Sequence, residues 1–179
     1  MSASGETGGD ARFEDSFKPM RLAARDADDL AVLSALLQDA VTVVGDVAWL
    51  PEERRFVMVA NRFRWEEPTA DERVRVGAHF EDVLAAAFKG FDLGEKTQPI
   101  AILSIAFEPA AEPPGGRVRI ACAGEAEILL TVEALEAALR DLSKPWPAKA
   151  RPEHAAPPGE SAAGEDGGGG GGASGAGGA

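Results

Sequence analysis

The chain has 179 residues and a formal net charge of −12, from 30 acidic and 18 basic side chains. This acidic balance disfavours sequence-independent binding to nucleic acid or anionic lipid, because clustered Lys and Arg supply that kind of affinity. The single cysteine, Cys122, excludes an internal disulfide and favours a reducing compartment. No apolar signal segment opens the sequence, and no stretch reaches the roughly 18 apolar residues of a membrane span. We therefore expect a cytoplasmic protein.

Composition divides the chain into three parts. Residues 1–17 are rich in Ser, Gly and acids, and residues 148–179 contain no aliphatic side chain larger than Ala. Such segments cannot bury enough apolar surface to offset the entropy lost on ordering. The sequence predicts two disordered ends and a single globular domain over residues 18–147.

The globular part opens with a predicted helix and continues mainly with strands. Asp26 is a candidate N-cap with Asp29 three residues later, and apolar residues from Leu30 to Ala40 recur at helical spacing. Val74 to Phe80 alternates with a period of two, which is typical of a half-buried strand. Turn signals and β-branched runs predict strands over residues 41–50, 55–65, 73–80, 99–108, 117–123 and 127–131.

Two segments near the sheet carry helical patterns. Residues 81–91 place apolar side chains on one helical face and include Ala85-Ala86-Ala87, so local propensity favours a helix ended by Gly90. Residues 132–142 place Val132, Leu135, Leu139 and Leu142 on one stripe before Pro145, which predicts a closing helix.

Several motifs together resemble an alphaproteobacterial family of unknown function, domain of unknown function 2948. They are Met20-Arg21-Leu22, Val44-Gly45-Asp46, Trp49-Leu50-Pro51, Asn61-Arg62-Phe63-Arg64-Trp65 and Pro145-Trp146. The resemblance covers nearly all of the folded part and brings no activity, cofactor or catalytic residue. In that family the segment matching 83–91 looks more like a strand, which favours a strand here, with the helix as the alternative.

The resulting order is helix, seven strands, helix. It predicts an α+β, mostly β fold with an N-terminal helix, about seven antiparallel strands in a curved sheet or barrel, and a C-terminal capping helix. A last strand that feeds a capping helix resembles pleckstrin-homology-like barrels. Many of those domains bind peptides or proteins and some bind phosphorylated lipid headgroups, but a shared fold carries function only weakly.

The chain shows no catalytic pattern. His79 lies at an outward strand position with no Ser or Cys at motif spacing, and His154 lies in the tail. No CxxC or HxxxH pair points to a metal, and no glycine-rich loop has the form of a phosphate cradle. We therefore predict a protein that is not an enzyme and has no metal and no cofactor.

The candidate binding residues lie on the second and third strands. If these strands are neighbours, four guanidinium groups share one face, those of Arg62, Arg64, Arg73 and Arg75. Like charges across a ladder are destabilising by up to about 1 kcal/mol per pair. The favoured explanation is a solvated salt-bridge network with Glu66, Glu67, Glu72 or an acid from another strand. The alternative is a site for an anion or an acidic protein surface.

Asn61 and His79 complete the candidate site. Asn61 has the strand parity of Val57 and Val59, which we take as the core face, so its amide either satisfies a bulge or faces a pocket.

The sequence favours a noncatalytic binding or adaptor module that takes a protein or a small anion on the arginine face or a sheet edge. The alternative is a self-assembling scaffold protein, so a homo-oligomer stays open. A small enzyme is a distant third, and it would need carboxylates to converge on His79. We expect no nucleic-acid partner.

Overall fold

The computed structural model describes residues 17–152, so the predicted disordered ends lie almost wholly outside the described residues. The described part is built from one helix, three short 3-10 segments and eleven strands. In chain order they are β1 (Arg21–Ala24), α1 (Ala27–Leu37), β2 (Val41–Val43), η1 (Val44–Asp46), β3 (Val47–Leu50), η2 (Pro51–Glu53), β4 (Arg55–Phe63), β5 (Glu72–Phe80), β6 (Val83–Lys89), β7 (Pro99–Pro109), β8 (Gly116–Cys122), η3 (Ala123–Glu125), β9 (Glu127–Val132), β10 (Ala137–Asp141) and β11 (Trp146–Pro147). The predicted α+β, mostly β class is confirmed, with more strands than the seven expected.

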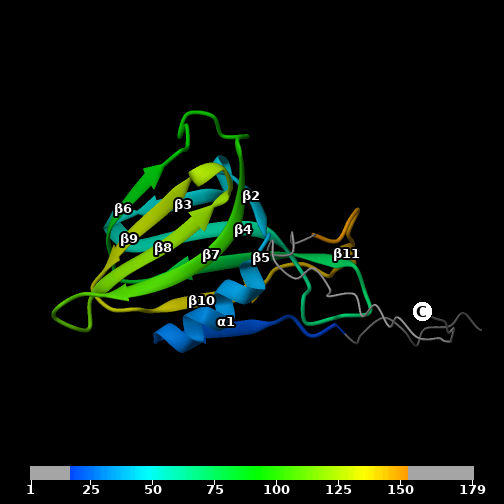
Figure 1. Ribbon diagram of the computed structural model, residues 1–179, viewed down its shortest axis with the longest axis horizontal. Coiled ribbons are helices and arrows are strands. Elements are labelled where there is room, and N and C mark those ends of the chain that lie inside the picture. The colour runs from blue at the N-terminus through cyan, green and yellow to red at the C-terminus, as the bar shows by residue number, and fades with distance from the viewer. Residues whose placement is uncertain (1–16, 153–179) are drawn as a thin grey trace, which may run out of the picture.

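All eleven strands belong to one antiparallel sheet. Their order is β1-β10-β5-β4-β2-β7-β8-β9-β6, with β3 beside β4 and β11 beside β5. The sheet is curved and does not close, because β1 and β6 stand at its two ends. In Figure 1 the strands β6 to β9 form a front layer, β4 and β5 lie behind them, and α1 lies below. The curved-sheet prediction is confirmed and the barrel is not.

The helix α1 begins and packs as its sequence predicts. Asp26 Oδ1 accepts a hydrogen bond from Asp29 N at 2.8 Å, which caps the first turn. The buried face of α1 carries Leu30, Leu33 and Leu37. On the facing strand β7, Ile105 N donates to Ser34 Oγ at 2.8 Å, so the helix is tied to the sheet by a polar contact as well as by its leucines.

The hydrophobic core lies between the two layers and α1. Buried residues of β5 are Val74, Val76, Ala78 and Phe80, the alternation predicted from the sequence. The same period of two continues in β8 and β9. The buried apolar residues form one contiguous cluster with members from both layers and from the helix. Within residues 17–152, no helix is long and apolar enough to cross a membrane.

The predicted closing helix over residues 132–142 is wrong. Val132 ends β9, and β10 follows as a strand hydrogen-bonded to β1 on one side and β5 on the other. Ala137, Leu139 and Asp141 of β10 are buried with a period of two, whereas Leu142 is 52% exposed. Pairing with two neighbours overrides the local helical spacing. The analogy with pleckstrin-homology-like barrels rested on that helix and is not confirmed.

The ambiguous segment forms strand β6, as the family resemblance favoured. It pairs antiparallel with β9 from Val83 to Lys89, with a bulge between Val83 and Ala85. Gly90 ends the strand at φ +80°, where a Cβ would lie 2.9 Å from Ala126 Cα. Only glycine fits that turn, so Gly90 stops a strand here rather than capping a helix.

Candidate functional site

The register of β4 and β5 separates the four arginines. Arg62 lies opposite Val74, whereas Arg75 lies opposite Asn61 and Arg73 lies two residues earlier on β5. Directly opposed residues of an antiparallel pair share a face. Arg62 therefore points into the core with Val74, and the two β5 arginines lie on the outer face. The prediction that all four guanidinium groups share one face is wrong.

Arg62 is fully buried between two carboxylates. Its Nε and Nη2 donate to the two oxygens of Asp141, each at 3.1 Å, and its Nη1 and Nη2 donate to the two oxygens of Glu66, each at 2.9 Å. Asp141 also accepts from Met20 N at 3.1 Å. Burial lowers the pKa of Arg62, but these hydrogen bonds raise it by more, so the pKa stands above its usual value. The guanidinium joins β4 to β10 and to the N-terminal lead-in, and it has no free side for a ligand.

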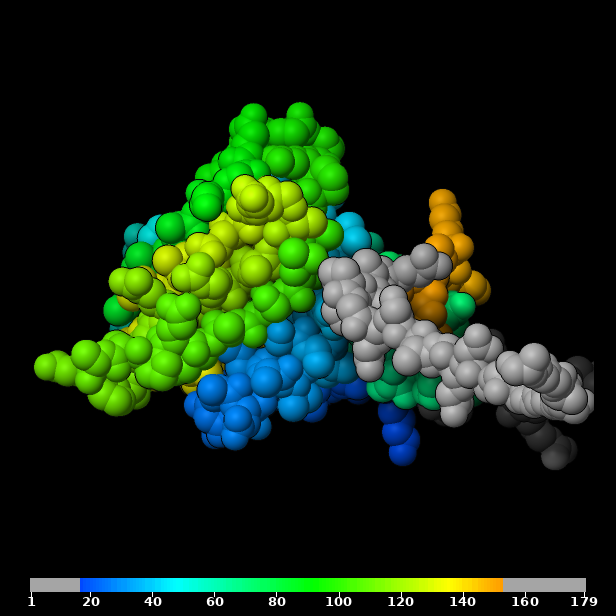
Figure 2. Space-filling model, in the orientation of Figure 1, coloured from blue at the N-terminus to red at the C-terminus, as the bar shows by residue number. Residues whose placement is uncertain are grey.

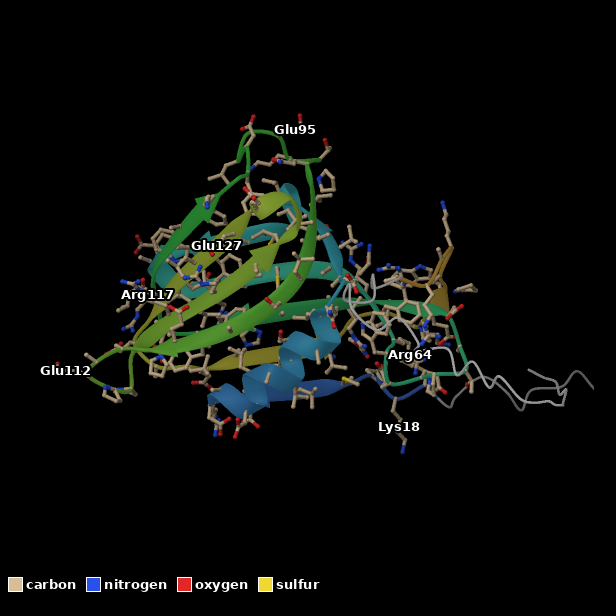
Figure 3. All side chains as sticks on the ribbon, viewed as in Figure 1. Lys18, Arg64, Glu95, Glu112, Arg117 and Glu127 are labelled. Atoms are coloured by element: carbon tan, nitrogen blue, oxygen red, sulfur yellow. The ribbon has the colours of Figure 1, made fainter. Side chains whose placement is uncertain are left out.

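Arg64 is also engaged by acids of the chain. It forms ion pairs with Glu72 and, at 3.6 Å, with Glu66, while its guanidinium lies 5.6 Å from the centroid of the Phe17 ring. Figure 3 shows it at the end of the molecule where the β4–β5 connection meets the C-terminal segment. The predicted salt-bridge network is confirmed for Glu66 and Glu72, and Asp141 of β10 is the acid from another strand that the prediction allowed for.

Asn61 and Arg73 line an open groove on the outer face. The core residues of β4 are Phe56, Met58 and Ala60, so the prediction that Asn61 lies on the core face is wrong. Arg73 Nη1 donates to the main-chain oxygen of Asn61 at 3.1 Å. The groove measures about 680 Å³ and is also lined by Val41, Trp146, Pro147 and Lys149.

The C-terminal segment borders this groove. Ala148 N donates to Asp71 O at 2.8 Å, and the guanidinium of Arg151 lies 5.4 Å from the ring centroid of Phe63. Phe63 is on the outer face of β4 but is buried, because the Arg151 guanidinium lies over its ring. The centroid of the Trp65 ring is 4.7 Å from that of Phe63. The groove thus bears two cationic side chains, Arg73 and Lys149, and residues 146–150 form part of its wall.

Over residues 17–152, the histidine and the cysteine lie in separate environments. His79 is 43% exposed, with Nε2 3.5 Å from Glu81 Oε1, and Glu81 also accepts from Arg55. Cys122 is buried, and burial followed by the nearby Glu127 charge raises the pKa of its thiol to about 11. No group of three His, Cys, Asp or Glu side chains that could hold a metal ion occurs over residues 17–152.

A seam lies between the end strand β6 and the strand β3, which pairs only with β4 among the described strands. At one end of the seam, Val83 N donates to Arg54 O at 2.8 Å, and the Arg54 side chain pairs with Asp82 at 3.4 Å and with Glu133. Beyond this point no strand pairing joins β3 to β6 in the part of the chain that the structure describes. The β6–β7 loop, which follows the far end of β6, rises green above the body of the molecule in Figure 2.

An apolar pocket of about 230 Å³ occupies the open end of this seam. Val47 and Trp49 line one side, Phe88, Phe91 and Ile100 line the other, and the exposed Lys96 also reaches it. The ring of Phe88 lies 6.4 Å from that of Phe56, which continues the core into the pocket wall. Sequence reasoning missed this site, because Trp49 and Phe88 meet only through the curl of the sheet.

The strand β6 presents a free edge beside the pocket. It pairs with β9 on one side, and its other side has no strand partner among the described residues. From Val83 to Phe88 it carries no charged residue and no proline, and Leu84 is 52% exposed. The side chains of Ala85 and Ala87 are also exposed. The molecule therefore offers an unprotected strand edge next to an apolar pocket.

Comparison with known proteins gives one match. The chain matches a family described as "Protein of unknown function (DUF2948)" over residues 20–154. No curated protein and no solved structure matches it. The matched range includes the whole described sheet and helix, so the chain belongs to this family of unknown function.

Proposed function

We propose that the protein is a noncatalytic binding module that takes an extended segment of a partner protein along the edge of β6. The observation that carries this proposal is the uncharged, proline-free edge from Val83 to Phe88. Natural sheets usually protect such an edge with charges, prolines or a covering element, since exposed main-chain groups recruit another strand. By contrast, the opposite edge strand β1 has only four residues, against seven in β6.

The side chains of β6 indicate what kind of segment fits. Ala85 and Ala87 are small and exposed, so an added strand can approach the edge without steric obstruction. Leu84 offers an apolar contact at the bulge. Strand addition takes its affinity from main-chain hydrogen bonds and its specificity from alternate side chains. The fitting partner is an extended segment rich in β-branched and apolar residues.

The noncatalytic part of the proposal is supported by the state of two reactive groups. The pKa of Cys122, about 11, keeps its thiol protonated at neutral pH, and nucleophilic cysteines act as thiolates. His79 faces Glu81 rather than a nucleophile. A cytoplasmic location remains our expectation from the composition.

The arginine-face hypothesis for an anionic ligand is weaker than the edge. Arg62 and Arg64 are taken up by Glu66, Glu72 and Asp141, which leaves Arg73 and Arg75 with Asn61 on the outer face. Arg75 itself lies 3.4 Å from Asp46. An anion would have to compete with these contacts.

Self-assembly is a second candidate, favoured by the same edge. An uncharged edge strand can pair with the edge of a second copy and continue the sheet across a two-fold axis. Self-assembly differs from partner binding because the oligomeric state of the isolated protein would then depend on the protein concentration. It would make the domain a scaffold rather than an adaptor.

The test uses a double variant, Ala85→Lys with Ala87→Lys, whose new side chains point to solvent and charge the edge. The matched control is Val32→Lys with Leu103→Lys, which adds the same charge at exposed positions of α1 and β7. Peptides selected from a random displayed library on the native protein are measured by fluorescence anisotropy. We expect native protein and control to bind alike and the edge variant to bind at least about tenfold more weakly.

Hydrogen exchange locates the bound peptide on the sheet. Protection of β6 amides upon binding supports the proposal, and equal binding by the edge variant, or protection elsewhere, contradicts it. Light scattering on the same proteins separates the second candidate. A native dimer that the edge variant converts to monomer assigns the edge to self-assembly instead.

A further inference from the structure

The C-terminal strap, residues 146–152, lies on the sheet as an extended segment. Its two-residue strand β11 pairs with the edge of β5 that β10 leaves open, opposite Glu72 and Arg73. Ala148 N then donates to Asp71 O at 2.8 Å, which continues the main-chain pairing by one residue. The strap is therefore held by strand addition, a mode in which sheets take extended peptides.

The end of the strap fills a site that suits a guanidinium group. The guanidinium of Arg151 lies 5.4 Å from the ring centroid of Phe63 and 5.9 Å from that of Trp65. Its Nη1 donates to Asp71 Oδ1 at 3.1 Å. Guanidinium groups stack on aromatic faces and pair with carboxylates. Phe63, Trp65 and Asp71, called the platform from here on, thus fit an arginine side chain.

The two aromatic rings of the platform are positioned by the sheet. Phe63 lies in β4, where it is paired in register with Arg73 of β5. Trp65 follows the end of β4, and its Nε1 donates to Gln38 O at 3.1 Å. Neither of these contacts involves the strap, so the rings keep their support when the strap is displaced.

The strap itself is held by few and exposed contacts. The side chains of the Arg151–Asp71 ion pair are 45% and 54% exposed, and pairs of such exposure contribute little to stability. Both residues of β11 are exposed. The open groove of about 680 Å³ runs beside residues 146–150. Segments with so few buried contacts open at a low free-energy cost.

We propose that the platform binds an arginine on an extended segment of a partner protein, and that the strap occupies it as an intramolecular competitor. The partner segment displaces the strap, pairs with β5 at Glu72 and Arg73, and places its arginine over Phe63 and Trp65. In the strap, the arginine stands four residues after the proline that pairs with Glu72, and the partner shares this spacing.

The charge of the protein favours a basic partner segment. The chain has a net charge of −12, which attracts cations over a longer range than the contacts themselves. The platform is a second site, separate from the β6 edge, because β11 and β6 lie on opposite sides of the molecule in Figure 1.

The experiment measures binding of a labelled peptide with the sequence of residues 144–152 to the full-length protein by fluorescence anisotropy. The strap variant, Ala148→Pro with Arg151→Ala, removes the donor to Asp71 O and the guanidinium. Lys149→Ala is the matched control, because it removes a strap cation that lines the groove rather than the platform. A second peptide carries citrulline, the neutral counterpart of arginine, at the position of Arg151.

Melting temperatures check that each variant is folded. If the double variant does not fold, Arg151→Ala alone takes its place, since this side chain is 45% exposed.

We expect the arginine peptide to bind the strap variant at least about tenfold more tightly than the native protein, in which the tethered strap competes. Lys149→Ala should match the native protein. The citrulline peptide should bind the strap variant about tenfold more weakly than the arginine peptide, because it loses the ion pair and the cation–π contacts. Adding Asp71→Asn to the strap variant should weaken the arginine peptide about fivefold.

The β6 edge is tested apart from the platform. Adding Ala85→Lys and Ala87→Lys to the strap variant should leave binding of the arginine peptide unchanged, so failure of the edge proposal is distinguishable from failure of this one.

Three results would overturn the proposal. The first is the absence of saturable binding of the arginine peptide by the folded strap variant up to about 1 mM. The second is equal binding of the arginine and citrulline peptides, which would leave the guanidinium without a role. The third is equal binding by the native protein and the strap variant, which would place the peptide outside the site that the strap occupies.

Discussion

Arg62 is a buried charge whose removal should be costly. The guanidinium is 0% exposed and shares four hydrogen bonds with Asp141 and Glu66. Replacing it with Met keeps the apolar volume of the stem but leaves the Asp141 carboxylate, itself 4% exposed, without its counter-ion. Breaking such a pair from one side typically costs about 3–5 kcal/mol. We expect Arg62→Met to lower the free energy of unfolding by that amount in urea denaturation.

The control for this prediction is Arg75→Met. Arg75 and Asp46 form an ion pair at 3.4 Å in which both side chains are about half exposed, 50% and 43%. Exposed pairs contribute about 1 kcal/mol or less. Similar losses for the two variants would mean that the buried pair is no stronger than a surface one.

Glu66 should make the stability of the protein depend on acid pH. Burial raises the pKa of this carboxyl, but the hydrogen bonds and charge of Arg62 outweigh it, so the pKa lies below 4.5, its ordinary value. A group with a lowered folded pKa stabilises fully above its unfolded pKa and loses that contribution as the pH falls through the folded value. The native free energy of unfolding should therefore fall below about pH 4.5.

The variant Glu66→Gln removes this titrating group. Its unfolding free energy should be lower at neutral pH and should fall less on acidification than that of the native protein. Glu67→Gln is the control, since Glu67 accepts from Thr69 and forms no ion pair with Arg62. Parallel pH curves for native protein and Glu66→Gln would contradict the assignment.

Along β4, the alternation of side chains does not by itself tell which face of the strand is buried. Val57 and Val59 alternate with Phe56 and Met58, so both faces of the strand read as apolar. Arg62 lies on the Phe56 face, and a charged side chain is rarely buried unless it is paired. Its partner Asp141 lies 79 residues away in sequence. Only the tertiary arrangement of β4 and β10 could reveal that pair.

At the scale of elements, the segments that sequence reasoning assigned correctly are those with local signals. The cap of α1 and the period of two in β5 are contained in a few neighbouring residues. The segment 132–142, which contains β10, is different, because the spacing of its residues Leu135, Leu139 and Leu142 fits a helix equally well. What decides for a strand is the pair of neighbours β1 and β5, which the local sequence does not contain.

The N-cap of α1 can be tested directly. Asp26 Oδ1 satisfies the main-chain N–H of Asp29, and loss of such a cap costs about 1 kcal/mol. We expect Asp26→Ala to lower the free energy of unfolding by that amount. Asp28→Ala is the control, because Asp28 lies in the same first turn and affects only the helix dipole, worth about 0.3–1 kcal/mol. A larger loss in Asp28→Ala than in Asp26→Ala would refute the cap.

At the scale of the molecule, the class of fold could be predicted and its closure could not. Hairpin turns and alternation indicate an antiparallel sheet, whereas whether the sheet closes depends on how far eleven strands twist and curl together. The seam pocket also depends on that curl, because it lies between β3 and β6. Trp49 and Phe88 therefore had no joint signature in the sequence, although each was visible as an apolar strand residue.

The two layers should unfold as one cooperative unit. A single cluster of buried apolar residues joins α1, β4 and β5 to β7, β8 and β9. The three tryptophans, Trp49, Trp65 and Trp146, all lie in the β3–β4–β5–β11 region, so their fluorescence reports that region alone. Circular dichroism reports the whole sheet, and for a two-state domain both signals share one midpoint. We expect coincident urea transitions. A second circular-dichroism transition without a fluorescence change would show instead that the β6 to β9 layer unfolds independently, with the seam as its boundary.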